Sequence, residues 1–423
     1  MRDVAAASIW REGAFVRFWA ASTISYVGSF ITRTALPLTA IYVLESGPLE
    51  ISALRSVELI GWLLVGLVAG AWVDRLRRRP IMIIADLGRA ILLASIPIAA
   101  IAGVLGLGQL IVVAFLTALL STFFNSASVA YLPTIVARQR LLAANSALSA
   151  SQSAAEFTGF ALSGVLVQVL TAPIAIAIDA VSFIASALLL GTIRRSEPAR
   201  PPIAEREPML HEIREGIRVV TGSPTLRAIA AAHAATHVLW GVFGATYLLF
   251  ATREVGLGPA AIGVVAALGG LGAFVGATTA GRIARRVGIG PAMILGLTGM
   301  TLGNALIPLA PSGAVLIGAA FLIGQQLIGD SAGTVYDVVE QSLTQSIVEG
   351  RILGRVNATV EFVTTLLALA GAIGGGIIAE VFGLRWALAV GVLGGAAAVV
   401  FIWFSPVRTL RTIPEPLEPA AAA

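Results

Sequence analysis

Two histidines inside a long apolar stretch have the spacing of a chemical site. His233 and His237 are four residues apart, which puts both imidazoles on one face of a helix. Such a pair can supply half of a metal site, but no carboxylate on the same stretch completes it, so we predict no metal. The pair then either titrates or contacts a substrate in a cavity, or simply packs. Trp240, one turn on, either offers an aromatic surface to an apolar or cationic ligand or packs at an interface.

Single charged residues also lie deep inside apolar stretches, where their cost makes function the default interpretation. Glu156 lies about 22 Å along its predicted helix. It could carry a proton, or it could bind a neighbouring helix as a satisfied carboxyl. Arg33 and Glu58 lie near the outer ends of two successive predicted helices. They could pair as an external gate or as a structural bridge.

Other polar residues are spaced to interact along one helix. Asp86 and Arg89 are three residues apart and can pair with each other, so we predict a structural pair. A polar stripe at helical spacing occurs later in the chain, at Gln326, Asp330, Thr334 and Asp337. The stripe could guard the inner mouth of a cavity or cap a helix that extends into water.

The composition of the chain indicates that these residues lie in helices surrounded by lipid. Of the 423 residues 57% are hydrophobic and 12% are charged, and the mean hydropathy is +0.91. A soluble protein has about 25% charged residues, so most of this surface must face lipid. The net charge of +5 does not indicate a nucleic-acid partner, because the 28 cationic residues, all arginines, lie in short links between apolar stretches. The lack of cysteine excludes disulfides and thiolate metal sites.

Apolar stretches long enough to cross a hydrocarbon core of about 30 Å recur along the whole chain. We therefore predict an all-α polytopic membrane protein with twelve transmembrane helices. The expected ranges are 15–43, 52–73, 80–103, 107–131, 141–169, 173–193, 225–251, 258–283, 289–309, 312–337, 354–381 and 384–405. With both termini in the cytoplasm, 23 of the 28 arginines lie on the cytoplasmic side and three, Arg55, Arg253 and Arg385, lie outside.

The chain divides into two halves around a polar segment. We predict a six-helix bundle at 1–193, a cytoplasmic linker at 194–224, a second bundle at 225–405 and a disordered cytoplasmic tail at 406–423. In the linker, Met209, Ile213, Ile217 and Val220 have the spacing of an amphipathic helix lying on the membrane. Two short patterns recur between the halves: Asn125-Ser126-Ala127 with Tyr131 matches Asp330-Ser331-Ala332 with Tyr336, and Arg75, Arg78 and Arg79 match Arg282, Arg285 and Arg286.

Asp74 ends the second predicted helix, where a carboxylate faces the negative end of the helix dipole at a cost of about 0.3–1 kcal/mol. The neighbouring arginines, or the positive N-terminus of another helix, could offset that cost. The segment that begins near Gly354, with Arg355, is the candidate in the other half. Such a contact would close one side of the protein and bias a two-state equilibrium.

The sequence GAWVDRLRRR, residues 70–79, resembles the signature loop of the major facilitator superfamily, G-x-x-x-D-R-x-x-R-R. The resemblance covers essentially the whole chain, including ADLGRA (85–90), YLPTIV (131–136), LLAANSALSASQSAAE (141–156) and IDAVSFIASALLL (178–190). These stretches resemble the branch of macrolide-efflux and enterobactin-exporter-like proteins. The resemblance implies the MFS fold, two pseudo-symmetric six-helix bundles that alternate access to a central cavity. The gating residues of the family correspond to Asp74, Arg75, Arg78 and Arg79.

These observations together predict a secondary active transporter, not an enzyme, that exports small amphipathic or lipophilic compounds. The proton gradient would drive it, and no cofactor is expected, because a G-x-x-x-x-G-K-[ST] phosphate loop cannot occur in a chain without lysine. The expected partners are the lipid bilayer and a small-molecule substrate, with the chain acting as a monomer in the plasma membrane. Two alternatives stay open: a siderophore or lipid exporter, coupled or uncoupled, and a membrane sensor that transports nothing.

Overall fold

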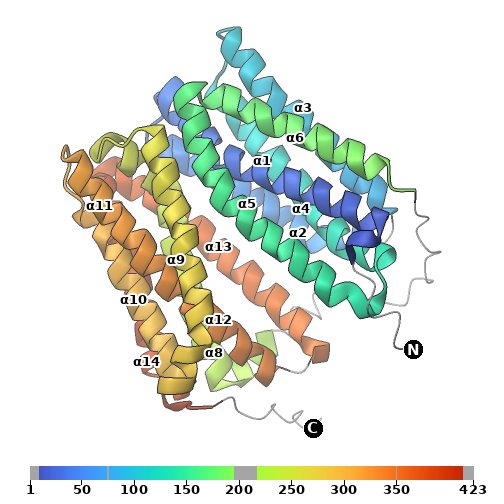
Figure 1. Ribbon diagram of the computed structural model, residues 1–423. Helices are drawn as coiled ribbons and strands as arrows, with labels where there is room; N and C mark the ends of the chain where they lie inside the picture. The colour runs from blue at the N-terminus through green and yellow to red at the C-terminus, as the bar shows by residue number, and fades with distance from the viewer. Residues whose placement is uncertain (1–8, 74–75, 195–216, 349, 413–423) are drawn as a thin grey trace. The chain divides into compact units, whose positions relative to one another are not determined.

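The computed structural model describes residues 9–73, 76–194, 217–348 and 350–412, without the side chains of 66–73 and 350–353. Within these ranges every regular element is helical (Figure 1). The first six long helices are α1 (Gly13–Val43), α2 (Pro48–Val73), α3 (Arg78–Ile101), α4 (Leu107–Ile135), α5 (Leu141–Val169) and α6 (Ala172–Gly191). The others are α8 (Pro224–Leu249), α9 (Pro259–Val287), α10 (Ile289–Leu309), α11 (Val315–Gln325), α12 (Ser331–Ile347), α13 (Gly350–Phe382) and α14 (Leu384–Trp403). The predicted all-helical fold is confirmed.

Two wide π-helical turns occur in the second half of the chain. One, η3 (Phe250–Glu254), extends α8, and the other, η4 (Gln326–Asp330), joins α11 to α12 in a single rod. This rod continues ten residues past the predicted end at residue 337. The helix continues because its backbone hydrogen bonds persist into a polar sequence. The predicted end at residue 337 was placed where the apolar residues end. Nine of the described helical segments are long and apolar enough to cross a membrane.

Two predicted segments, the amphipathic helix of the linker and the C-terminal tail, lie partly outside the described residues. The amphipathic helix of the linker is described only from Ile217 onward. The expected tail begins instead with a short 3₁₀ helix, η5 (Pro406–Thr409), in which Val407 is fully buried. Burial of an apolar side chain gives this part of the tail a fixed place.

The chain forms two compact units. Unit 1 contains α1 to α6 and residues 258–267, which include the start of α9. Unit 2 contains α8, the rest of α9 and α10 to α14. In unit 1, α1 packs on α5 and α6, and α3 packs on α4 and α6. In unit 2, α8 packs on α13 and α14, and α10 packs on α12 and α14.

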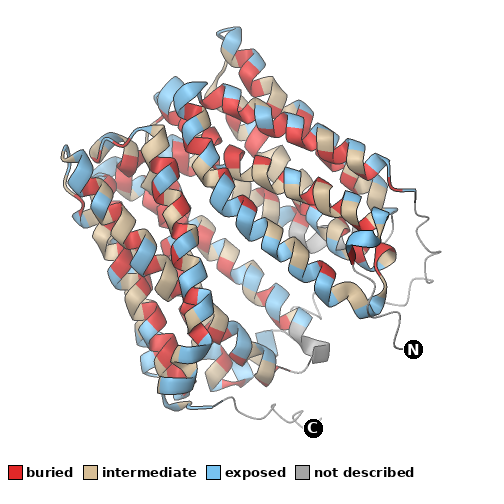
Figure 2. Ribbon diagram, in the orientation of Figure 1, coloured by how far each residue is buried: buried red, intermediate tan, exposed pale blue. Residues whose placement is uncertain are grey.

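Buried and exposed residues alternate along the helices of each unit (Figure 2), and many large apolar side chains are exposed. Ile91, Val129 and Leu188 of unit 1 and Leu316 and Phe404 of unit 2 are among the exposed ones. In water such surfaces would drive association. Their number fits helices whose surroundings are lipid.

Helix starts repeat between the two units. The starts of α1 and α8, α2 and α9, and α3 and α10 differ by 211 residues in each pair, and Pro97 and Pro308 inside α3 and α10 differ by the same number. The α6 and α14 starts differ by 212. The repeat predicted from Arg78 and Arg285 was therefore out of register, because Arg78 begins α3 whereas Arg285 lies in the last turn of α9.

Candidate functional site

The interior of unit 1 contains a charged cluster on α3. Arg89 Nη2 lies 2.5 Å from Asp86 Oδ1, and the two side chains are 4% and 0% exposed. The i, i+3 spacing puts both groups on one face of α3, as the sequence indicates. Ser121 of α4 accepts a second hydrogen bond, from Arg89 Nη1 at 3.3 Å.

Two aromatic rings hold the Arg89 guanidinium in place. Its carbon lies 4.6 Å from the centre of the Phe124 ring on α4 and 4.0 Å from the centre of the Phe183 ring on α6. A guanidinium within about 6 Å of an aromatic face is attracted by the ring quadrupole. Arg89 thus joins α3 to α4 and α6.

Asp179 of α6 completes this cluster, and sequence reasoning missed it. The residue is 1% exposed, and its Oδ1 accepts a hydrogen bond from Ser182 Oγ at 2.9 Å. Arg89 is the opposite charge and Asp86 the like charge that act on it. The carboxylate fits because α1 has Gly28 opposite it: a Cβ there would overlap Asp179 Oδ1 and Ser182 Oγ. An aspartate in the eighth position of a 20-residue apolar helix was the available signal.

A cavity of about 220 Å³ opens beside Asp179 inside unit 1. Its charged lining is Arg33 from α1, Arg55 and Glu58 from α2, and Asp179. The remaining wall is made of small hydroxyls and apolar side chains: Ser29, Thr32, Leu36, Leu93, Val113, Ala114, Thr117, Ala118, Ser121 and Phe183. The cavity therefore combines ionic groups with an apolar wall.

Glu58 pairs within its own helix. Its carboxylate lies 2.9 Å from Arg55 Nη1, and both side chains are about one-third exposed. Arg33, which the sequence offered as a partner of Glu58 across two helices, lines the same cavity without an ion pair to it among the contacts of the described residues. The i, i+3 spacing within α2 makes the shorter connection.

Glu156 is exposed on α5, so it is not the buried carboxylate that the sequence suggested. It remains within electrostatic reach of Arg33, together with Arg55 and Glu58. Unit 1 thus holds two sets of interacting charges. Asp86, Arg89 and Asp179 form the buried set, and Arg55, Glu58 and Glu156 act on Arg33 in the other.

Two arginines complete the end of α6. Arg79 Nε donates to the Leu190 carbonyl at 2.8 Å, and its Nη2 donates to the Gly191 carbonyl. Arg17 of α1 donates to the Thr192 carbonyl at 3.0 Å. The last carbonyls of a helix have no partner within the helix, and a cation there also favours the dipole. Arg79, a predicted gating residue, therefore has a capping contact.

Of the remaining predicted gating residues, two lie outside the described residues and two are half-buried. Asp74 and Arg75 lie outside the described residues. Arg78 is half-buried at the first position of α3, and Arg355 is half-buried in α13.

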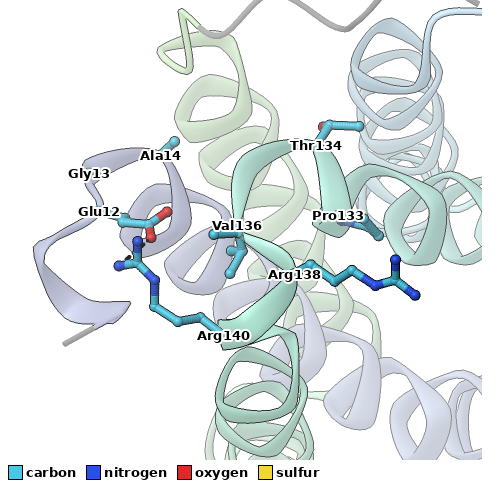
Figure 3. Close-up of a pocket in the computed structure, with 9 residues that line it drawn as sticks. Glu12, Gly13, Ala14, Pro133, Thr134, Val136, Arg138 and Arg140 are labelled. Carbon is cyan, nitrogen blue, oxygen red and sulfur yellow. Dashed lines mark ion pairs between the residues drawn. The ribbon is translucent and has the colours of Figure 1, made fainter. Parts of the chain in front are cut away.

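A second cavity, of about 470 Å³, lies in unit 1 where α4 ends and α1 begins. Figure 3 shows Glu12 and Arg140 facing each other across it, while Arg138 points away from them. Glu12 Oε1 lies 2.7 Å from Arg140 Nη1. This ion pair ties the start of α1 to the link between α4 and α5.

The histidine pair of unit 2 is close together and half-buried. The rings of His233 and His237 lie 4.8 Å apart, and His237 Nδ1 donates to the His233 carbonyl at 2.8 Å. This bond leaves His237 Nε2 free to accept or bind. Among the described residues no group of three or more His, Cys, Asp or Glu could hold a metal ion. Trp240 is 44% exposed, one turn along α8.

Gln326 and Asp330 stand at the two ends of the wide turn η4. Both are half-buried against α9, where a Cβ on Gly269 would lie 2.6 Å from Asp330 Oδ2 and 2.8 Å from Gln326 Nε2. Ser331 Oγ also donates to the Gly272 carbonyl at 2.7 Å. The glycines of α9 thus form a close packing surface.

Known proteins resemble the chain over most of its length. An uncharacterized MFS-type transporter of Bacillus subtilis (strain 168), YfiS, is 26% identical over 88% of each chain. A bacterial homologue of the iron transporter ferroportin, solved in an inward-facing state, has 20% identity, a TM-score of 0.74 and coverage of 94% of this chain and 99% of its own. An aspartate-to-alanine mutant of the nucleoside transporter NupG has 14% identity, a TM-score of 0.73 and coverage of 92% of this chain and 98% of its own.

The two solved structures support the fold alone, because their sequence identity to this chain is low. The family model named Major Facilitator Superfamily matches residues 18–329 and 229–422, which together span nearly the whole chain. The chain therefore belongs to the Major Facilitator Superfamily and is a multi-pass membrane transporter.

Proposed function

We propose that this transporter exports small amphipathic or lipophilic compounds from the cell by alternating access, with the proton gradient as its driving force. The observation that carries the proposal is the mixed cavity of unit 1, where charged and apolar side chains share one wall. A compound with both an apolar body and a polar group is complementary to such a wall. The direction of transport follows from the resemblance of the 131–156 and 178–190 stretches to macrolide-efflux proteins.

The size of the cavity limits what it can hold. Drug-sized ligands occupy pockets of about 300–1,000 Å³. At about 220 Å³, the cavity accommodates the polar end of such a compound rather than the whole molecule. Arg33 and Glu58 would select that end by charge, and Leu36, Leu93 and Phe183 would contact the apolar part.

Proton drive is supported by the carboxylates inside unit 1. Two buried carboxylates, Asp86 and Asp179, share one guanidinium group, that of Arg89. Ionisable groups within a membrane are costly, and they mark ion or proton pathways in transporters. In the proposed orientation both termini lie in the cytoplasm and the protein resides in the plasma membrane, because the arginines concentrate on one side.

The test compares cells that produce the wild-type chain with cells that lack it. Export predicts lower accumulation of lipophilic dyes and higher resistance to lipophilic drugs, both reversed by a protonophore. Asp74→Asn should abolish resistance if the loop gates transport, whereas Glu380→Gln, an exposed carboxylate on α13, serves as the matched control. Higher accumulation in producing cells, or export that is indifferent to the protonophore, would contradict the proposal.

A further inference from the structure

We propose that Asp179 is the proton-binding residue of unit 1, holding one exchangeable proton beside the Asp86–Arg89 ion pair. The inference rests on the proposed proton coupling and gives it a residue. Asp179, Asp86 and Arg89 are each at most 3% exposed, so their charges have almost no contact with water. In such surroundings a net charge is costly, and a carboxylate escapes the cost by binding a proton.

The charged groups around Asp179 come from four helices. Asp86 and Arg89 of α3 act on Asp179 directly, and Arg33 of α1 and Arg55 and Glu58 of α2 line the same cavity. Glu156 of α5 is exposed and acts on Arg33. The helix α4 and residues 258–267 have no charged residue. Arg55 and Glu58 neutralise each other at 2.9 Å.

The remaining charges do not balance. Arg33 and Glu156 are opposite charges within electrostatic reach of each other, and both are exposed, so they lie outside the buried set. Asp86, Arg89 and Asp179 then sum to one negative charge, which a single proton neutralises. Unit 1 therefore requires one bound proton to bury this cluster without net charge.

Geometry assigns the proton to Asp179 rather than to Asp86. Asp86 is held directly by Arg89 at 2.5 Å, and this contact favours its ionised form. Asp179 has a neutral hydroxyl donor, Ser182, on Oδ1. Asp179 also lines the cavity, whereas Asp86 and Arg89 do not, so the cavity gives its proton a path of exchange.

The bound proton would also alter the interaction between α3 and α6. Phe183 and Asp179 lie one turn apart on α6, and both face Arg89 of α3. When Asp179 is protonated, α6 contacts the guanidinium through the Phe183 ring alone. Loss of the proton adds a charge attraction between α3 and α6, so proton binding changes the contact between these helices.

Infrared titration of the purified full-length protein in lipid nanodiscs tests the site without any transported compound. A pH change should remove one protonated-carboxyl band in the wild type. That band should be absent in Asp179→Asn and retained in Glu380→Gln. Asp86→Asn should shift the pH of its loss, because it removes the like charge that acts on Asp179. Thermal unfolding of each variant shows whether it has folded.

A band that persists in folded Asp179→Asn would overturn the assignment. If Asp179→Asn does not fold, Asp179→Glu serves instead: it should keep the band at a shifted frequency, and an unshifted band would overturn the assignment equally. The transport proposal fails separately, through dye export that ignores the protonophore. In that case a titrating band lost in Asp179→Asn still supports the proton site.

Discussion

The two units solve the same packing problem with different chemistry. The starts of α3 and α10, and the prolines inside them, are 211 residues apart. By the same offset, Asp86 and Arg89 of unit 1 correspond to Leu297 and Met300 of unit 2. Asp86 and Leu297 are both 0% exposed, and Arg89 and Met300 are both 3% exposed. An apolar pair therefore fills in unit 2 the place that an ion pair fills in unit 1. The matching place in unit 2 is thus packed without charges.

The α1–α6 contact of unit 1 and the α8–α14 contact of unit 2 also differ, because the larger residue comes from a different helix in each. In unit 1 α6 supplies the bulky residue, Asp179, and α1 supplies the small one, Gly28. At the position matching Asp179, α14 has Gly391, and a Cβ there would lie 3.1 Å from Val242 Cγ1 of α8. Close packing needs one large and one small partner, whichever helix provides each.

Replacing Arg89 by the matching residue of unit 2 should have the largest effect. Arg89→Met leaves the ionised Asp86 carboxylate buried without its counter-charge, so the free energy of unfolding should fall by about 3–5 kcal/mol. Adding Asp86→Leu and Asp179→Asn removes the uncompensated charge and the titratable carboxyl beside it, and should recover most of the loss. Denaturant titration in mixed micelles measures both. Equal instability of the single and triple variants would mean that the charges stabilise unit 1 beyond their mutual pairing.

Adding bulk at Gly28 tests the exchange of large and small partners. Gly28→Ala places a methyl group against Asp179 and Ser182 and should destabilise unit 1 by about 1–3 kcal/mol. Gly374→Ala in α13 is the control, because a Cβ there meets no atom within 4 Å. Thermal unfolding should separate the two variants, and similar melting temperatures would contradict the close approach of α1 and α6.

Removing one aromatic face from Arg89 should have a moderate effect. Phe183→Leu keeps an apolar side chain but loses the ring over the guanidinium, at a cost of about 0.5–2 kcal/mol. Phe274→Leu changes an exposed ring of α9 and provides the baseline. In the Arg89→Met background, the Phe183→Leu effect should shrink. An unchanged effect in that double-mutant cycle would assign the loss to packing alone.

The cap on α6 should give the smallest effect. Arg79→Gln removes the charge at the Leu190 and Gly191 carbonyls, and the expected cost is about 0.3–1 kcal/mol. Arg138→Gln removes an exposed arginine as the comparison. If Arg79→Gln abolishes dye export while thermal unfolding stays near that of wild type, Arg79 acts in gating beyond its capping contact.

Local spacing could be predicted from the sequence better than contacts between helices. Asp86 and Arg89 were paired correctly in space because both lie on one turn of α3. Asp179 was missed because its significance comes from Arg89 and Gly28, on two other helices. Arg33 was offered to Glu58 for the same reason, since a sequence does not show which of two nearby arginines reaches a carboxylate first.

Helix register was also hard to predict because short motifs repeat by chance. The Asn125 and Asp330 patterns are 205 residues apart, whereas the ends of α4 and α12 are 212 apart. Helix boundaries and an internal proline set the register more firmly than a three-residue match. The twelve helices themselves followed from apolar length, which depends on no other part of the chain.

The wide turn η4 has a consequence for any residue-by-residue comparison of α4 with the rod formed by α11 and α12. A π turn accommodates one residue more than an α turn, and each residue of an α-helix turns the chain by about 100°. Side chains beyond Asp330 thus point about 100° away from where an uninterrupted helix would aim them. The stripe from Gln326 to Asp337 consequently bends around the rod, and its two ends address different neighbours.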